Sequence, residues 1–168
     1  MCSVTFCLKL PIAICRQLLR HRTGKFNEFS QRYSEVTEEV DRLRLEKNDS
    51  ILRGADKINK QARDYNLSED QKGTIKEQII KLEKLQVQIF NGYLDLLKAC
   101  LSKELARFYL PVSTYTTIYV QFDLNNLIKF LRLRCAPDAQ HEIRIYAEAM
   151  RQLARQFFPT CLDLEDSY

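Results

Sequence analysis

The sequence has few of the residues that mark several common protein classes. Its 168 residues include only four glycines and two histidines, and no G-x-G-x-x-G loop of the kind found in doubly wound dinucleotide-binding folds. No apolar run approaches the ~20 residues that a membrane-spanning helix needs. The N-terminus also lacks the charged, apolar and small-residue order of a secretory signal peptide. We therefore expect a cytoplasmic protein with no membrane partner, in which any dinucleotide is bound in another way.

The six cysteines are scattered along the chain and form no C-x-x-C motif. With only two histidines to complete a ligand set, this spacing indicates neither a metal site nor a disulfide framework. We expect small buried side chains or reduced thiols at these positions. They are Cys2, Cys7, Cys15, Cys100, Cys135 and Cys161.

Charge of either sign is not in strong excess. The 26 Lys and Arg residues outnumber the 22 Asp and Glu residues, which gives a formal net charge of +4 at pH 7. This mild excess suits an anionic ligand but is too small to demand nucleic acid, which we do not expect as a partner. The content of 45% hydrophobic and 29% charged residues is ordinary for a globular protein. We expect a single domain over residues 1–168.

Hydrophobic periodicity predicts a helix-rich chain with a small sheet. Alternating apolar side chains are typical of half-buried strands, and apolar residues three and four apart are typical of amphipathic helices. The predicted strands are 4–10 and 112–122, and residues 35–70 are expected to form loops and short helical turns. Helices are predicted from Pro11 onward, and over 74–100, 103–109, 124–134 with Asp123 as N-cap, and 139–157. The fold class that we expect is α+β.

The apolar stripes of these helices predict which residues are buried. In the first helix the stripe includes Ile12 and Leu19, and in the last helix it includes Leu153 and Phe157. The stretch 74–100 has a second apolar edge, so we expect it to be buried on more than one side. Its role is structural first and a subunit contact second.

The stretch from Arg20 to Ser34 concentrates ionic and hydrogen-bonding side chains in one turn-like segment. Arginine offers planar, bidentate donors that match phosphate or carboxylate, and Gly24 allows close backbone approach. The segment therefore predicts an anion site, with a solvated basic loop as the alternative. Its basic side chains are Arg20, His21, Arg22, Lys25 and Arg32.

The helix that begins at Pro11 is expected to deliver this segment. Gln17 and Arg20 are three residues apart and would share a helical face, while His21 and Arg22 turn away from it. One face could then hold a nucleotide and the other a cofactor. A histidine that is hydrogen-bonded within a loop is the alternative for His21.

Arg20-His21-Arg22, followed after seven residues by Ser30, resembles the signature of the flavin-dependent thymidylate synthases. Asn27-Glu28 and Arg32-Tyr33 also stand in family positions, and the resemblance resumes from 102 to 158. The resemblance implies that the N-terminal part of the family domain is lacking here. It further implies a variable excursion at 37–73, in which Lys60-Gln61 matches a family Lys-Gln pair only weakly.

The resemblance implies an activity, which is the reductive methylation of dUMP to dTMP. Methylenetetrahydrofolate would supply the carbon, reduced FAD the hydride, and NADPH the electrons that reduce the flavin. The resemblance also implies a homotetramer in which several chains assemble each active site. A non-catalytic nucleotide- or nucleic-acid-binding remnant is the second possibility, and a structural helical partner for the tetramer of a longer homologue is the third.

The resemblance also implies roles for individual residues. Arg134 would be catalytic, with Arg132 as the weaker candidate, and Ser30 would bind substrate because no histidine or acid is placed to activate it as a nucleophile. Gln140 and Glu142 would serve the site or complement the helix dipole. The implied substrate-binding residues are Gln17, Arg20, Glu28, Ser30, Gln31, Arg32, Arg107 and Arg134. The implied cofactor-binding residues are Arg20, His21, Arg22, Glu28, Asp123, Asn125 and Lys129, of which the last three differ from better-studied relatives.

Overall fold

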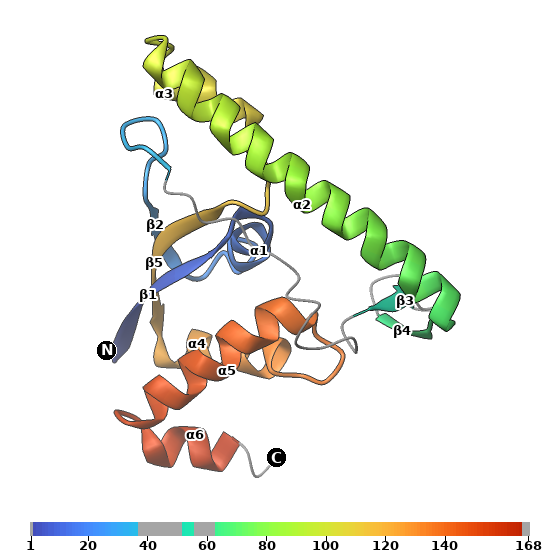
Figure 1. The fold of residues 1–168 in the computed structure, drawn as a ribbon. Helices are drawn as coiled ribbons and strands as arrows, with labels where there is room; N and C mark the ends of the chain where they lie inside the picture. Colours follow the sequence, from blue (N-terminus) through green and yellow to red (C-terminus); the bar gives the residue numbers. More distant parts are fainter. Residues whose placement is uncertain (1, 37–51, 56–62, 166–168) are drawn as a thin grey trace. The chain divides into compact units, whose positions relative to one another are not determined.

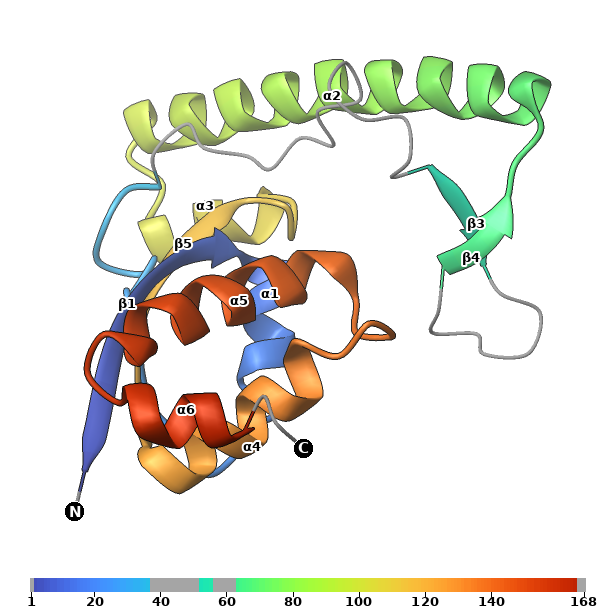
Figure 2. The ribbon, with the colours of Figure 1, turned by 90° about the horizontal axis from the view of Figure 1, so that it is seen from below.

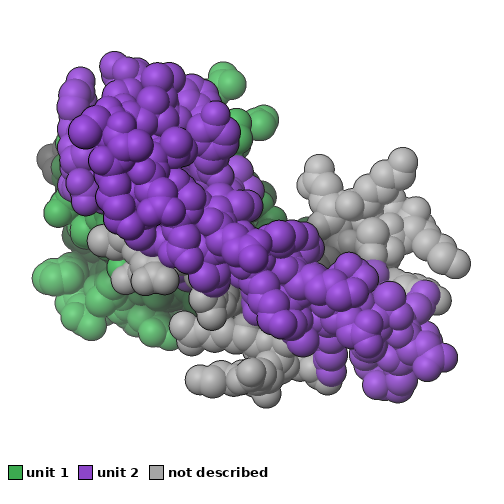
Figure 3. All heavy atoms as spheres, turned by 45° about the horizontal axis from the view of Figure 1, so that its top comes forward, with its two compact units in different colours: residues 1–28, 116–168 green, residues 29–115 purple. Residues whose placement is uncertain are grey.

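The computed structural model describes residues 2–36, 52–55 and 63–165. The chain forms two compact units (Figure 3), here called the sheet unit, Met1–Glu28 with Thr116–Tyr168, and the long-helix unit, Phe29–Tyr115. The expectation of a single domain stays a prediction. Lys60-Gln61 and most of the expected excursion lie outside the described residues. Among the described residues, no helix is both long enough and apolar enough to cross a membrane.

The sheet unit is built around a sheet of three strands, in which β5 (Tyr115–Asp123) lies between β1 (Ser3–Pro11) and β2 (Lys25–Glu28) (Figure 1). β2 runs antiparallel to β5, with Phe26 opposite Val120. Side chains alternate along β1, where Phe6 and Leu10 are buried while Cys7 is exposed. This alternation confirms the predicted first strand, because period-two burial is what a half-buried strand requires.

Four helices belong to the sheet unit, and three of them were predicted. They are α1 (Ile12–Leu18), α4 (Leu124–Arg134), α5 (His141–Arg155) and α6 (Pro159–Glu165). α5 contacts the other three helices, as Figure 2 shows. Together with the sheet they enclose one core of Phe6, Leu10, Ile14, Cys15, Leu18, Ile118, Val120, Phe122, Leu127, Phe130, Leu131, Ile143, Ala147, Met150, Ala154 and Leu162.

Two strands of the sheet unit pass directly into helices. Pro11 is the last residue of β1 and the N-cap of α1, so the prediction of a helix that begins at Pro11 is wrong by one residue. Asp123 is likewise the last residue of β5 and the N-cap of α4. Its carboxylate accepts a hydrogen bond from the Asn126 backbone N–H at 2.9 Å, which confirms the predicted cap.

The end of the chain differs from the prediction. One helix was expected over 139–157, but α5 ends at Arg155 and α6 begins at Pro159, where a proline fits the first helical turn. Leu153 and Phe157 were expected in the core and are 51% and 72% exposed. In α1, likewise, Leu19 is exposed.

The cysteines divide between buried and exposed positions. All six are free thiols, and only Cys15 is buried, while Cys135 is half-buried and the other four are exposed. The expectation of small buried side chains therefore holds for Cys15, and reduced thiols describe the rest. Burial raises the pKa of Cys15 to about 12, and the negative charge of Glu28 adds to this effect.

The long-helix unit contains a small hairpin and three helical segments. β3 (Arg53–Ala55) pairs antiparallel with β4 (Arg63–Asn66), where the sequence predicted only loops and turns. The helical segments are α2 (Glu69–Lys98), α3 (Lys103–Ala106) and the 3₁₀ turn η2 (Arg107–Tyr109). α2 contacts both α3 and η2.

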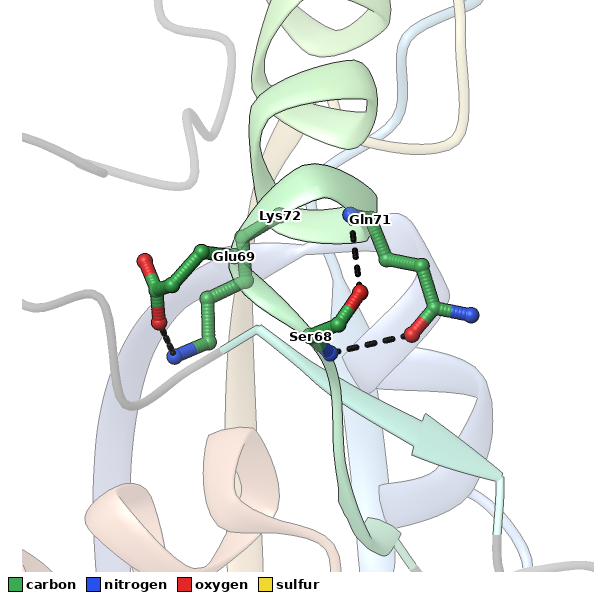
Figure 4. A network of polar contacts seen from close by, with 4 residues as sticks. All are labelled: Ser68, Glu69, Gln71 and Lys72. Carbon is green, nitrogen blue, oxygen red and sulfur yellow. Dashed lines mark hydrogen bonds and ion pairs between the residues drawn. The ribbon is translucent and has the colours of Figure 1, made fainter.

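Capping side chains explain why α2 begins five residues before the predicted start. The Ser68 hydroxyl accepts from the Gln71 backbone N–H, and the Gln71 side chain accepts from the Ser68 backbone N–H at 3.0 Å (Figure 4). This reciprocal pair is a capping box. Lys72 also contacts Glu69 at 2.7 Å one turn into the helix. Polar capping therefore starts the helix where no apolar stripe marks it.

The end of α2 has a left-handed residue. Cys100 has φ 64°, the one positive value among the described non-glycine residues. The Leu101 N–H donates to the Leu96 carbonyl, and the Cys100 N–H donates to the Leu97 carbonyl, each at 3.0 Å. These two bonds form a Schellman motif, in which the left-handed position usually holds glycine.

Burial along α2 is concentrated near its C-terminal end. Phe90 and Tyr93 are buried, and the Tyr93 hydroxyl accepts from the Val36 N–H at 3.2 Å. The prediction that this helix is buried on more than one side is wrong for the chain itself. Large apolar side chains that remain exposed are Ile80, Leu82, Leu85, Val87 and Ile89.

Candidate functional site

The basic signature lies in a turn between α1 and β2. α1 ends at Leu18, and backbone bonds then join His21 N to the Leu18 carbonyl at 3.1 Å and Gly24 N to the His21 carbonyl at 3.0 Å. Arg20 therefore follows the end of the helix, and the expectation that α1 itself presents the signature is wrong. Lys25–Glu28, which follow the turn, form β2. The stretch from Arg20 to Ser34 is therefore not a single turn-like segment.

Gly24 is needed for packing against aromatic rings. A Cβ at this position would lie 2.8 Å from Phe122 Cε1 and 2.8 Å from Phe26 Cζ. These two rings meet edge-on, with centroids 6.2 Å apart. The close approach that the sequence predicted thus occurs, but in this structure the approaching groups are ring carbons of the core.

His21 and Arg134 are brought together by this turn and the end of α4. The Arg134 Nε–H donates to His21 Nε2 at 2.9 Å, across 113 positions of sequence. The His21 ring also meets Phe130 edge-on, with centroids 4.8 Å apart and planes at 79°. His21 was predicted to contact the cofactor and Arg134 to be catalytic. The fold brings these two side chains into direct contact.

The electrostatics of this pair favour one protonation state. Burial lowers the pKa of His21, and the positive charge of Arg134 lowers it further. Burial also lowers the pKa of Arg134 from its usual value. Because arginine remains protonated at any ordinary pH, the pair consists of a neutral imidazole and a charged guanidinium near pH 7.

Amide side chains connect α1 to the start of α5. The Gln17 amide donates to the Gln140 side-chain oxygen, and Gln140 Nε2 donates to Glu142 Oε2 at 2.8 Å. Gln17 was predicted to bind substrate. For Gln140 and Glu142 the sequence left two roles open, one in the site and one in complementing the helix dipole. This chain of bonds fixes the orientation of the Gln17 amide, because each amide uses its oxygen and its nitrogen in a set direction.

The negatively charged candidates are engaged by neighbouring groups. Glu28 Oε1 accepts from the Thr116 hydroxyl at 2.7 Å, between adjacent strands. Asp123 accepts from the backbone N–H and side-chain amide of Asn126, and these bonds lower the pKa of Asp123. The Asp123 carboxylate thus has a clear local role as the cap of α4.

The positively charged candidates of the sheet unit are accessible. Arg20 and Arg22 are exposed in the turn, and Lys129 is exposed on α4 together with Asn125. These side chains can reach an anionic ligand without breaking the core. Among the described residues, no group of three or more His, Cys, Asp or Glu side chains is arranged to hold a metal ion.

The remaining substrate-binding candidates belong to the long-helix unit. Ser30 closes a small turn, in which its hydroxyl accepts from the Arg32 N–H at 3.3 Å. Arg32 Nη2 contacts Glu104 Oε1 at 3.0 Å, and its guanidinium lies 5.7 Å from the centre of the Tyr33 ring. Gln31 and Arg107 are half-buried, and Arg107 begins η2.

The structure thus divides the predicted site residues into two sets. The long-helix unit carries Ser30, Gln31, Arg32 and Arg107, and the sheet unit carries Gln17, Arg20, His21, Arg22, Glu28, Asp123, Asn125, Lys129 and Arg134. Partners that sequence reasoning missed are Phe130, Thr116 and Glu104. Thr116 contacts Glu28 across 88 positions, so no local pattern could have revealed it.

Comparison with known proteins identifies the family. The family described as thymidylate synthase complementing protein (Thy1) matches residues 1–160 of the chain. A protein of Treponema denticola named flavin-dependent thymidylate synthase is 42% identical over 163 residues, which are 96% of this chain and 59% of that protein. One from Thermus thermophilus with the same name is 38% identical over 92% of this chain and 53% of its own length. The chain therefore spans between half and two thirds of these relatives.

Solved structures agree with this result. The UMP/dUMP methylase PolB of Streptomyces cacaoi, bound with 5-Br UMP, is similar with a TM-score of 0.74 and 32% identity over 92% of this chain and 69% of that chain. The same protein bound with 5-Br dUMP gives a TM-score of 0.72 at 33% identity, over 92% of this chain and 66% of that one. The fold is thus the α+β, helix-rich fold with a small sheet that the hydrophobic periodicity predicted. On the match over residues 1–160, this chain belongs to the Thy1 family, the family of the flavin-dependent thymidylate synthases.

Proposed function

We propose that this chain serves in the reductive methylation of dUMP to dTMP, with FAD as cofactor and with methylenetetrahydrofolate and NADPH as co-substrates. Its family membership, the name shared by its curated relatives and the dUMP analogue bound to its structural neighbour support the proposal. The observation that carries it is the contact between His21 of the signature and Arg134 of α4. Because these two candidates are 113 positions apart in the sequence, their contact supports their membership of one site.

Arg134 has the central chemical role in this proposal. Its guanidinium is half-buried, so water screens its charge less than that of an exposed arginine. Placed beside a uracil carbonyl, it stabilises the negative charge that develops on the ring as the new carbon bond forms. Preorganised donors of this kind contribute about 3–4 kcal/mol in comparable sites.

Substrate contacts from the long-helix unit are assigned to Ser30, Gln31, Arg32 and Arg107. Arg32 is paired with Glu104, with both side chains about half exposed at 49% and 50%. Such an exposed ion pair is weak, so a nucleotide phosphate can replace the carboxylate at little cost. Gln17 offers an amide whose direction is already set by Gln140.

Four of the predicted cofactor-binding residues suit an anionic cofactor, and the two carboxylates among them do not. The exposed cations Arg20, Arg22 and Lys129 and the amide of Asn125 suit a diphosphate such as that of FAD. Glu28 and Asp123 do not fit, because their carboxylates are engaged by Thr116 and Asn126 and repel a diphosphate. When bound, the flavin supplies hydride transfer, and the chain supplies binding and orientation.

The proposal includes assembly as a homotetramer with active sites shared between copies. The exposed apolar side chains of α2, such as Leu82 and Ile89, support contact with another chain. A cytoplasmic location stays a prediction.

The proposal is tested first by the visible absorption of the purified chain after incubation with FAD and removal of unbound FAD, before and after dUMP is added. A flavin spectrum that shifts with dUMP is expected if both sites form. Titration calorimetry then measures dUMP affinity of Arg134→Ala, which should fall at least tenfold, about 1.4 kcal/mol, while FAD affinity changes little. Arg16→Ala, an exposed arginine on α1, is the matched control and should bind as the unaltered chain does.

Two results would contradict this proposal. A chain that stays colourless with FAD and ignores dUMP would lack both sites. An equal loss of dUMP and FAD binding in Arg134→Ala would mean that the arginine supports the fold in general. If the colourless chain instead bound single-stranded DNA with steep salt dependence, the binding remnant would be the better account.

A further inference from the structure

The contact between Arg134 and His21 uses a particular atom of the guanidinium. The donor is Nε–H, which belongs to the side edge of the guanidinium fork, and the acceptor is His21 Nε2 at 2.9 Å. A bond at Nε fixes rotation about the last side-chain torsions of Arg134. It does so while leaving both terminal Nη groups available by chemistry for a ligand such as a uracil carbonyl.

The acceptor is itself held from two directions. The backbone of His21 is fixed in the turn by its bond to the Leu18 carbonyl and by the bond from Gly24 to its own carbonyl. The ring packs edge-on against Phe130. Phe130 and Arg134 are four residues apart on α4 and so share a face of that helix. One face of α4 therefore provides both the Phe130 ring that orients His21 and the Arg134 guanidinium that donates a hydrogen bond to it.

The bond requires a neutral imidazole. His21 Nε2 accepts only with a free lone pair, so the single ring proton must be on Nδ1. Among the described residues, the charged group that acts on His21 is Arg134, and its other ring contact is the apolar Phe130. A second proton would remove the acceptor and place a positive charge against the guanidinium.

We propose that His21 is a positioning residue. It holds the Arg134 guanidinium in the orientation that the pyrimidine nucleotide needs, and it releases the guanidinium when the imidazole is protonated. The identity of the ligand rests on the proposed function. The contact itself does not, because it is made within the chain. Burial and the charge of Arg134 both lower the pKa of His21, so release occurs below the ordinary histidine range, at a pH under about 6.5.

The first experiment follows the Arg134 Nε–H by proton–nitrogen NMR in the full 168-residue chain. At pH 7.5 the bonded Nε–H should exchange slowly and give a separate signal, which disappears as His21 titrates. His141→Gln removes the other histidine, which is exposed, and so assigns the His21 titration. His21→Phe keeps a ring against Phe130 but has no acceptor, so the signal should be absent at every pH.

His21→Gln is the conservative variant. Its side-chain oxygen can accept from Arg134 and does not titrate. The Nε–H signal should therefore return in His21→Gln and persist at low pH. A merely structural histidine would make no such distinction, because both replacements fill the space and neither carries charge.

The second experiment measures dUMP affinity of the same variants at pH 7.5 and pH 5.5. His21→Phe should bind dUMP about tenfold less tightly at pH 7.5, because binding must then order an Arg134 side chain that the hydrogen bond no longer holds. The unaltered chain should bind less tightly at the lower pH. His21→Gln should recover most of the loss in His21→Phe and show a smaller change between the two pH values.

The outcomes separate this inference from the proposed function. An Nε–H signal that is unchanged in His21→Phe would overturn the positioning role, whatever the ligand. Tight dUMP binding in His21→Phe would do the same. Failure of the unaltered chain to bind dUMP would overturn the proposed function, and the NMR result would then alone decide whether His21 positions Arg134.

Discussion

The two units of this protein use similar sequence patterns to different ends. In the sheet unit, sixteen described residues form one buried core around three strands. In the long-helix unit, the buried cluster has four described residues, Val36, Phe90, Tyr93 and Ala106, although α2 alone has thirty residues. Both units show apolar residues at helical spacing. The difference teaches that periodicity predicts that a helix forms, whereas burial depends on what the helix packs against.

The largest expected effect comes from the same substitution made in the two units. Leu127→Ala on α4 removes a fully buried side chain and should lower the free energy of unfolding by about 2–5 kcal/mol. Leu82→Ala on α2 removes a side chain that is 57% exposed in the single chain, so for the monomer it should change this free energy by less than about 0.5 kcal/mol. Urea unfolding followed by circular dichroism measures both. A large loss for Leu82→Ala would mean that another chain covers α2 in solution.

A second pair of substitutions should give opposite signs. Gly24→Ala puts a Cβ 2.8 Å from two aromatic rings and should destabilise by about 1–3 kcal/mol. Gly92 lies inside α2 with nothing within 4 Å of an added Cβ, so Gly92→Ala should stabilise by about 0.5–1 kcal/mol. Thermal unfolding of the two variants and the unaltered chain tests this. Equal signs would break the contrast between a tightly packed turn and an uncovered helix.

The buried thiol predicts a pH dependence for the sheet unit. Because burial raises the pKa of Cys15 from 9.0 to about 12, the folded state holds this proton more tightly than the unfolded state does. Its contribution to stability is complete below pH 9 and is lost as the pH rises toward 12, with a slope of at most about 1.4 kcal/mol per pH unit.

Comparison with Cys15→Ala isolates this slope. The stability of the variant should fall less steeply between pH 9 and pH 11 than that of the unaltered chain, and urea unfolding at each pH measures the difference. Parallel curves would contradict the assignment. Alkylation gives an independent check, because exposed thiols such as Cys7 and Cys100 should react well before the buried Cys15.

The smallest expected effect concerns the end of α2. Cys100 adopts a left-handed conformation, with φ 64°, that residues other than glycine tolerate poorly. Cys100→Gly should therefore stabilise the long-helix unit by up to about 1 kcal/mol. Cys161→Gly on α6 is the matched control and should destabilise, because glycine weakens a helix. Thermal unfolding would show the opposite shifts, and a loss of stability in Cys100→Gly would count against the strained cap.

Local signals in the sequence predicted local structure well. The alternation of β1 and the cap at Asp123 both depend on neighbouring residues, and both are found. β2 was missed because Lys25–Glu28 has one apolar side chain in four, and its strand conformation comes from pairing with β5. α6 was also missed, although Pro159 at its first position is a known start signal.

Features that depend on distant residues could not be predicted in the same way. Leu153 and Phe157 were expected on the buried stripe of α5, yet both are exposed. The buried face of α5 consists of Ile143, Ala147, Met150 and Ala154, which leaves Leu153 outside it, and Phe157 lies beyond the end of the helix at Arg155. The resemblance singled out His21 and Arg134 separately. Their hydrogen bond joins residues 113 positions apart, so only the fold could bring the two atoms within 2.9 Å.

The direct passage from strand to helix has a consequence for how this chain can change in length. Pro11 and Asp123 each end a strand and cap a helix, so no residue separates the strand from the helix that follows it. A helix turns by about 100° per residue, so one inserted residue after Asp123 would rotate every later side chain of α4 by almost a third of a turn. Arg134 would then face away from His21 although no side chain had been replaced. At these two strand-to-helix junctions, the number of residues is therefore as strictly constrained as their identity.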